Sequence, residues 1–492
     1  MIFKVSKKMP QKKSLAKNAV LNTAKTVCGI VFPIITYPYV SRVLGVDNMG
    51  IYTFSSYFLS YFLLIAALGV STYGIREGTR YREDKNTLQL FVSELFSINM
   101  LSTVIAYILL FILLFCIPSL NDYKTVIIIL SAEIVFTTIG VSWVCNVFED
   151  FLSIAIRTIV MQIVSLVLIF VFVRSSADLN KYAVILLVSN SGANIINFFY
   201  IQKKYCKFRF TFKINWKRHF KQILIIFSTS VAITVYVSSD TTMLGFMTDN
   251  YQVGLYGTAV KIYTIIKNIL AAILMVLIPR FTILFSKEDR ANTDELFSKV
   301  FNILSVIMLP MCIGLFMLSP DVVTIVSGKE YIGASASLRL LSIAIAFSLY
   351  SYMYAQCVLI PVRQEKVVFK ATLVSAIVNI VLNFVLIPFW GINAAAITTI
   401  IAELITFVIC YYYSRSIVVL TNIKRNLISV FLGMIGIFFV CYFAGRIDHL
   451  ILRISISIIG SVVIYVIILF IVKNPVLLYI GSMLRKKIDL SK

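Results

Sequence analysis

The sequence predicts an all-α integral membrane protein with about fourteen transmembrane helices, in two pseudo-repeated lobes around a central cavity. Hydrophobic residue types make up 60% of the 492 residues and charged types only 14%, whereas soluble domains carry about 25% charged residues. The apolar residues fall in blocks of about 20, the length of helix that crosses a hydrocarbon core of about 30 Å. Because lipid offers no partner for free backbone groups, these blocks must be helical.

Short polar gaps separate the expected spans, which are 14–38, 50–74, 92–117, 124–147, 154–173, 182–201, 222–247, 254–281, 297–318, 332–360, 367–388, 392–413, 426–444 and 451–472. No gap is long enough for a separate globular domain. We expect four parts: an N-terminal lobe with a cytoplasmic tail (1–201), a basic cytoplasmic linker (202–221), a C-terminal lobe (222–413), and two additional spans with a second tail (414–492).

The basic residues predict the orientation of the chain. Net charge is +23, from 45 Lys+Arg against 22 Asp+Glu. If both termini are cytoplasmic, the inside segments hold or adjoin 34 of these 45 residues and the outside segments hold 8. Cytoplasmic loops of membrane proteins carry this excess of lysine and arginine. The charge therefore indicates membrane orientation, not nucleic-acid binding.

A short pattern recurs about 200 residues apart, at the outer ends of the first two helices of each half. Leu44-Gly45 followed by Gly50-Ile51-Tyr52 is echoed by Leu244-Gly245 followed by Gly254-Leu255-Tyr256. Both copies share one orientation, and parallel repeats of this kind are typical of transporters, with a substrate site between the halves.

Enzyme signatures are missing from the sequence. It has no phosphate-binding G-x-x-x-x-G-K-[ST] loop, no H-E-x-x-H and no G-x-S-x-G. Seven of the eight cysteines lie in apolar segments, and no pair has the spacing of a metal or redox site. We therefore expect neither an enzyme nor a metal site.

Polar side chains recur at helical spacing inside several apolar spans, so each set lies on one helix face. Such sets are explained either by helix–helix hydrogen bonds, worth about 0.6 kcal/mol per contact, or by a shared water-filled cavity. The candidates for lining a substrate-binding cavity are Asn22, Lys25, Asn194, Lys261, Lys267 and Asn383.

The three lysines sharpen this choice, since an ammonium at membrane depth needs water or a partner. Facing a cavity, they would favour an anionic group such as a diphosphate. Alternatively, Lys25 reaches the inner membrane surface, and Lys261 and Lys267 form ion pairs, with Asp240 as one possible partner.

Three carboxylates lie within or near the spans, namely Glu133, Asp240 and Glu403. Each is a candidate for carrying a coupling cation, H⁺ or Na⁺, or is a structural counter-ion. We expect no other cofactor. The linker interleaves basic residues with Phe208, Phe210, Phe212 and Trp216, which favours a position along the anionic inner leaflet over a flexible tether.

Three stretches in order resemble the oligosaccharide-lipid (Wzx-type) flippases, in the superfamily of multidrug antiporters and lipid II flippases. They are "SRVLGVDNMGIYTFSSYFLSYFLLIAALGVSTYGIRE", "SSDTTMLGFMTDNYQVGLYGTAVKI" with "VLIPRF" after it, and "SAIVNIVLNFVLIPFWGINAAAITTIIAE". The resemblance covers the whole chain. It departs at "GINAAAITT", where the family more often has further small residues.

The resemblance implies an alternating-access carrier in the bacterial cell membrane with a cationic cavity. It would move polyprenyl-diphosphate-linked oligosaccharide from the inner to the outer leaflet for capsule, O-antigen or exopolysaccharide assembly. Its partners would be that lipid-linked oligosaccharide, membrane lipids, and assembly proteins such as a polysaccharide polymerase, with no nucleic acid. An ion-coupled multidrug antiporter of the same fold is the alternative.

Overall fold

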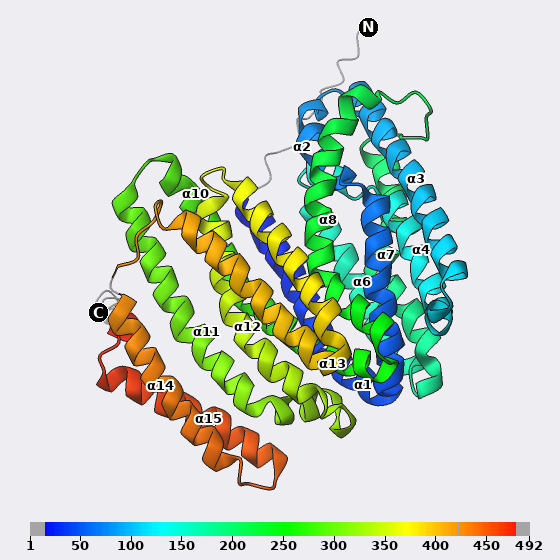
Figure 1. Cartoon of the computed structure of the whole chain (residues 1–492). Coiled ribbons are helices and arrows are strands. Elements are labelled where there is room, and N and C mark those ends of the chain that lie inside the picture. Colours follow the sequence, from blue (N-terminus) through cyan, green and yellow to red (C-terminus); the bar gives the residue numbers. More distant parts are fainter. Residues whose placement is uncertain (1–14, 422, 479–492) are drawn as a thin grey trace. The chain divides into compact units, whose positions relative to one another are not determined.

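The computed structural model describes residues 15–421 and 423–478, with their side chains from residue 27 onward. Throughout this described part the regular elements are helices, and twelve candidate spans are long and apolar enough to cross a membrane (Figure 1). The chain is therefore an all-α, multi-pass membrane protein, as predicted.

Two of the twelve spans contain a break at a glycine. Helix α1 (Leu15–Ala67) is interrupted at Gly45, with φ 77° and ψ 172°, and α13 (Glu365–Ser414) at Gly391, with φ 52° and ψ −131°. Side chains other than glycine rarely adopt these conformations. Counting both sides of each break separately gives fourteen candidate spans in the described part of the chain, in agreement with the predicted number.

The first compact unit holds the described residues up to Thr36 together with Leu59–Ser230. Buried hydroxyl and amide groups join its helices; for example, Thr103 and Thr138 share a hydrogen bond of 2.6 Å between α3 and α4. Its complete helices are α2 (Val70–Gly78), α3 (Lys85–Cys116), α4 (Lys124–Gly140), α5 (Trp143–Val147), α6 (Phe151–Phe172) and α7 (Leu179–Lys204).

The second unit holds Tyr37–Phe58 and the chain from Val231 onward, so α1 and α8 (Trp216–Met247) contribute residues to both units. Helix α12 is the most buried of the candidate spans and packs against α9, α11 and α13. The other helices of this unit are α9 (Asn250–Met275), α10 (Ile278–Ser286), α11 (Arg290–Ser327), α12 (Ala334–Tyr354), α14 (Ile423–Ala444) and α15 (Leu450–Ile471). The predicted lobe boundaries at 201, 221 and 413 stay predictions.

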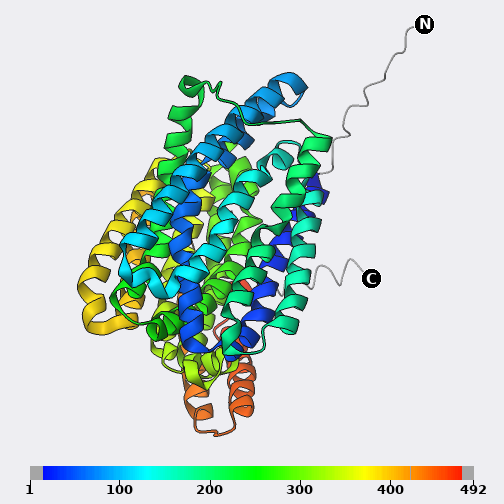
Figure 2. The same ribbon diagram turned by 90° about the vertical axis from the view of Figure 1, so that its right-hand side faces the viewer.

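Helices α14 and α15 form a hairpin that packs mainly on α11 (Figures 1 and 2). An ion pair between Arg453 of α15 and Asp321 of α11 joins the two elements. Large apolar side chains point outward along both helices of the hairpin, among them Phe431, Ile459 and Phe470. In a chain that spans a membrane, such outward faces contact lipid.

The two copies of the sequence repeat touch each other inside the second unit. A Cβ added to Gly50 would lie 1.9 Å from the carbonyl oxygen of Asn250, and one added to Gly254 would lie 2.2 Å from the carbonyl oxygen of Val46. The contact is reciprocal, because each glycine meets the residue four positions before the other one. Only glycine permits this approach of two backbones.

Candidate functional site

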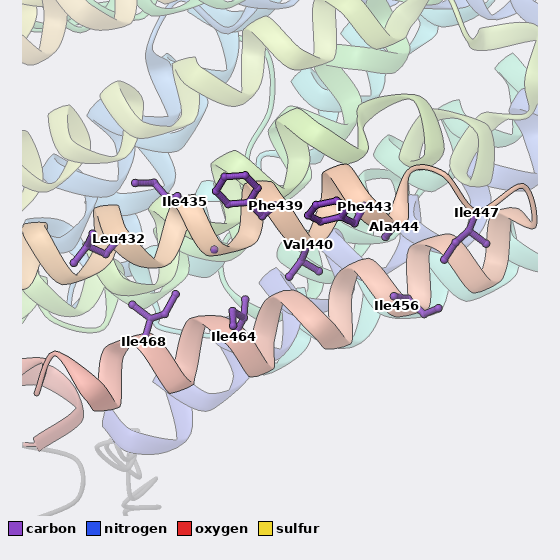
Figure 3. Close-up of a pocket in the computed structure, with 11 residues that line it drawn as sticks. Leu432, Ile435, Phe439, Val440, Phe443, Ala444, Ile447, Ile456, Ile464 and Ile468 are labelled. Carbon is purple, nitrogen blue, oxygen red and sulfur yellow. The ribbon is translucent and has the colours of Figure 1, made fainter.

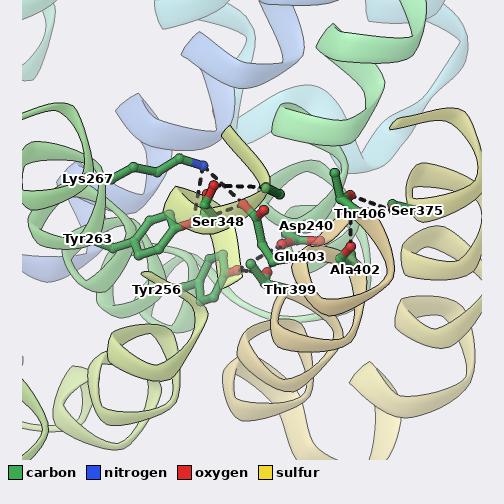
Figure 4. A network of polar contacts seen from close by, with 11 residues as sticks. Asp240, Tyr256, Tyr263, Lys267, Ser348, Ser375, Thr399, Ala402, Glu403 and Thr406 are labelled. Atoms are coloured by element: carbon green, nitrogen blue, oxygen red, sulfur yellow. Dashed lines mark hydrogen bonds and ion pairs between the residues drawn. The ribbon is translucent and has the colours of Figure 1, made fainter. Parts of the chain in front are cut away.

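The second unit contains a cavity of about 250 Å³ with polar walls. Side chains from the 37–58 segment, α8, α9, α12 and α13 converge on it, and Figure 4 shows the polar network at its wall. The lining residues with polar side chains include Tyr57, Asp240, Tyr256, Tyr263, Lys267, Asn268, Asn379, Thr399 and Glu403.

The break at Gly391 builds one wall of this cavity, because it folds α13 into an antiparallel hairpin. Across the hairpin, Ser375 and Thr406 share a hydrogen bond of 2.7 Å, and the Thr398 hydroxyl donates to Asn383 Oδ1 at 2.5 Å. The predicted polar face of the first part of α13 thus packs on the returning part. Buried polar groups are stabilised in this way by hydrogen bonds between neighbouring helices.

Asp240 of α8 lies at the end of this wall, and neutral side chains donate hydrogen bonds to its carboxylate. Asn383 Nδ2 donates to Oδ1 at 2.6 Å, while the Thr399 and Tyr256 hydroxyls donate to Oδ2 at 2.6 and 3.0 Å. Among the described residues no lysine or arginine forms an ion pair with this carboxylate. Its negative charge is therefore held by hydrogen bonds alone.

Glu403 is held differently from Asp240. Its Oε1 accepts from Lys267 Nζ at 3.0 Å and from the Tyr263 hydroxyl at 3.1 Å (Figure 4). Lys267 therefore pairs with Glu403, whereas the sequence offered Asp240 as a possible partner. The side chain of Glu403 is 5% exposed and that of Lys267 is 29% exposed, so the ion pair is largely buried.

Lys261 occupies a different environment on α9. Its ammonium lies 6.0 Å from the centre of the Tyr37 ring, a weak cation–π geometry. No carboxylate in the described part of the chain pairs with it. The side chain is partly buried, and Lys261 has no counter-ion among the described residues.

The remaining candidates with described side chains belong to the first unit. Glu133 of α4 accepts a hydrogen bond from the side chain of Asn190 on α7. Asn194 packs over Gly140 of α4 and accepts from Asn197 Nδ2 at 3.3 Å. The predictions for Asn22 and Lys25 fall on side chains that lie outside the described ones.

Sequence reasoning missed Tyr256, Tyr263 and Thr399. Hydroxyl side chains are frequent in membrane helices, so nothing distinguished these three beforehand. One signal was available, since Tyr256 belongs to the repeated Gly254-Leu255-Tyr256 pattern.

The described residues contain no cluster of three or more His, Cys, Asp or Glu side chains that could hold a metal ion. Cys206, outside the spans, is buried, and burial raises the pKa of its thiol to about 11. The protonated thiol is neither a good nucleophile nor a good metal ligand.

A larger groove of about 670 Å³ lies between α14 and α15 (Figure 3). Its lining side chains are all apolar, including Leu432, Phe439 and Ile464. It offers no side-chain hydrogen bond to a charged or sugar-bearing head group, so the polar cavity and Lys261 remain the candidate site.

The sequence model of the family described as "Polysaccharide biosynthesis protein" matches residues 15–285, more than half of the chain. A putative O-antigen transporter of Escherichia coli K12 is 22% identical over 394 residues, 80% of this chain and 94% of that protein. The capsular polysaccharide biosynthesis protein CapF of Staphylococcus aureus is 22% identical over 343 residues, 68% of this chain and 84% of that protein.

Among solved structures, the lipid II flippase MurJ in an inward closed conformation aligns with a TM-score of 0.73 at 16% identity. The alignment covers 92% of this chain and 98% of that one. A point mutant of a MATE protein aligns with a TM-score of 0.53 at 13% identity over 83% of this chain and 98% of that one. At these identities the likeness shows a shared fold.

The match to the family over residues 15–285 and the O-antigen transporter relatives confirm the predicted resemblance to the proteins of polysaccharide biosynthesis, and the fold is shared with a lipid II flippase and a MATE protein. The chain belongs to the polysaccharide biosynthesis protein family.

Proposed function

We propose that this protein is an alternating-access flippase for polyprenyl-diphosphate-linked oligosaccharide, acting from the inner to the outer leaflet during surface polysaccharide assembly. It is not an enzyme in this proposal, since it changes the leaflet of its substrate and no covalent bond. Its relatives include proteins named for O-antigen transport and capsular polysaccharide biosynthesis. The cell membrane, with both termini in the cytoplasm, is the proposed location, and a polysaccharide polymerase is a proposed partner.

The observation that carries the proposal is Lys261, a partly buried ammonium with no carboxylate partner among the described residues. A diphosphate is costly to take out of water without compensation. An ammonium at membrane depth would replace part of the lost hydration, acting as a point charge toward phosphate. Lys267 is less suited to this role, because Glu403 already balances its charge.

We further propose that Asp240 carries the coupling cation. Its carboxylate has neutral hydrogen-bond donors and no basic partner in the described structure. A bound H⁺ or Na⁺ would neutralise this charge, and carboxylate, amide and hydroxyl oxygens are ligands that hard cations prefer. Glu133 and Glu403 remain candidates for binding the coupling cation. Asp240 is preferred to them because Lys267 already pairs with Glu403 and because Glu133 lies in the first unit and does not line this cavity.

The test is flipping of a labelled polyprenyl-diphosphate oligosaccharide in proteoliposomes. The wild type, Lys261→Ala and Asp240→Asn are compared with and without a Na⁺ or H⁺ gradient. We expect Lys261→Ala to lose flipping under both conditions. We expect Asp240→Asn to keep the fold but lose its response to the gradient.

Lys287→Ala is the matched control, since this lysine is exposed between α10 and α11. Equal flipping by wild type and Lys261→Ala would remove that lysine from the mechanism. If the wild type does not flip the lipid but exports cationic drugs against a gradient, the multidrug antiporter becomes the better assignment. In that case the carboxylates of the cavity, and not Lys261, would bind the transported molecule.

A further inference from the structure

The connection from α7 to α8, taken with the last residues of α7 and the first residues of α8, is the most basic stretch of the chain. Residues 203–221 carry eight lysines and arginines and no aspartate or glutamate. Four aromatic side chains of the segment are exposed, and they are Phe210, Phe212, Trp216 and Phe220. The segment leaves one candidate span at Lys204 and enters the next at Trp216, so it lies at a membrane boundary.

The non-helical part of this segment is fastened to the first unit and is not a loose tether. Cys206 and Phe208 are buried in a core cluster with residues of α3 and α7. The backbone N–H of Arg209 donates to Ser93 Oγ at 3.3 Å, and that of Thr211 donates to Ser97 Oγ at 2.8 Å. The two serines are one helical turn apart on α3, so the segment runs along that helix, and Figure 2 draws it as an extended ribbon.

The start of α8 is fixed to the same unit by His219. This side chain is fully buried, and its Nδ1 lies 2.9 Å from the Tyr73 hydroxyl. Its Nε2 lies 2.7 Å from Glu94 Oε2 on α3. Both ends of the segment are therefore joined to the first unit by hydrogen bonds.

The outward side chains alternate in kind. Phe210 and Phe212 meet edge to face at 4.9 Å between ring centres, and Phe212 is 85% exposed. Trp216 and Phe220 form a second such pair at 6.3 Å. Exposed Lys213, Lys217 and Lys221 alternate with these rings along the chain, and no carboxylate of the described residues pairs with them.

Aromatic rings with lysines beside them match the chemistry of an anionic bilayer surface. Rings favour the level of the head groups, where one side is apolar and the other wet. Lysines are attracted to anionic lipid phosphates, and the attraction is screened by salt. We propose that this surface, made of Phe210, Phe212, Trp216, Phe220, Lys213, Lys217 and Lys221, binds anionic phospholipid head groups and rests the first unit on them.

Natural tryptophan fluorescence tests this in the full-length protein, because Trp216 is one of only three tryptophans. The protein is reconstituted in bilayers that contain brominated phosphatidylglycerol or brominated phosphatidylcholine at the same mole fraction. Subtracting the signal of a Trp216→Phe variant isolates Trp216. We expect stronger quenching by the anionic lipid, with each lysine contributing up to roughly fivefold to the preference.

The triple variant Lys213→Gln/Lys217→Gln/Lys221→Gln should lose this preference, and the wild type should lose much of it in high salt. The matched control, Lys287→Gln/Lys366→Gln/Lys370→Gln, removes the same charge from exposed lysines of the second unit. This control variant should keep the preference of Trp216 for the anionic lipid.

Equal quenching by both lipids would overturn the proposal, as would a preference that survives the triple substitution. A Trp216 signal that neither lipid quenches would also overturn it, and would leave the aromatic surface for a protein partner. The probes are ordinary phospholipids, so these outcomes do not depend on the transported substrate.

Discussion

The buried pair of Lys267 and Glu403 gives the sharpest prediction about stability. We consider Lys267→Met, Glu403→Gln and the double variant, because methionine and glutamine keep the volume of the side chains. In the wild type the ammonium and carboxylate are 3.0 Å apart, and the Tyr263 hydroxyl donates to the same carboxylate oxygen. Each single variant leaves one partner at membrane depth without its counter-charge.

The magnitude follows from this distance. At an effective dielectric constant of about 20, two unit charges 3.0 Å apart attract by about 5 kcal/mol. Removing one member of a buried pair costs about 3–5 kcal/mol, while replacing both by neutral groups is often neutral.

The assay is thermal unfolding of the purified protein in detergent, followed as the fraction that stays monodisperse after heating. We expect both single variants to lose several degrees and the double variant to recover most of the loss. Single effects that simply add in the double variant would refute the reasoning.

Three further predictions concern the rest of the second unit. Gly50→Ala places a Cβ 1.9 Å from a carbonyl oxygen at the start of α9, so it should lower the free energy of unfolding by about 1–3 kcal/mol. Thermal unfolding measures this loss. Gly314→Ala is the control, because an added Cβ there meets nothing within 4 Å and should leave the stability unchanged or raise it by up to about 1 kcal/mol. Asp321→Asn breaks the ion pair between α11 and α15, so hydrogen exchange should rise in α15 and not in α9. The side chain of Asn292 donates to Asp289 and lowers the pKa of that carboxyl, which caps α11. The cap is therefore intact above the ordinary aspartate pKa and is lost as the pH falls through the lowered one. Asp289→Ala should speed exchange at the start of α11 at pH 7, and an equal rate in both proteins would contradict this.

The sequence predicted the spans well where a composition change marks their ends. The expected gap between 388 and 392 contains Gly391, where α13 breaks. The predicted gap between the spans 14–38 and 50–74 is placed less well, because the first of these spans is expected to end at Pro38. The helix continues through it to a single break at Gly45. Proline is tolerated in membrane helices when neighbouring groups satisfy the carbonyl that it frees one turn earlier.

The candidate site could be predicted only one helix at a time. Ser375, Asn379 and Asn383 follow one another at intervals of four residues, so the sequence alone puts them on one face of α13. It did not reveal that Glu403 would neutralise Lys267, since the two residues are 136 positions apart and meet only in the folded chain. Likewise, the residues between α7 and α8 have no periodicity, so the burial of Phe208 could not be foreseen.

The reciprocal contact of Gly50 and Gly254 has a consequence for the history of the gene. A surface that meets its own copy in this way is the mark of a two-fold homodimer. Finding it within one chain fits a half-length ancestor that paired with itself before duplication and fusion. Each glycine faces a carbonyl that belongs to the other copy, so a larger residue at either position would disrupt the contact of both copies. We therefore expect these two glycines to persist among distant relatives after most of the similarity between the halves has disappeared.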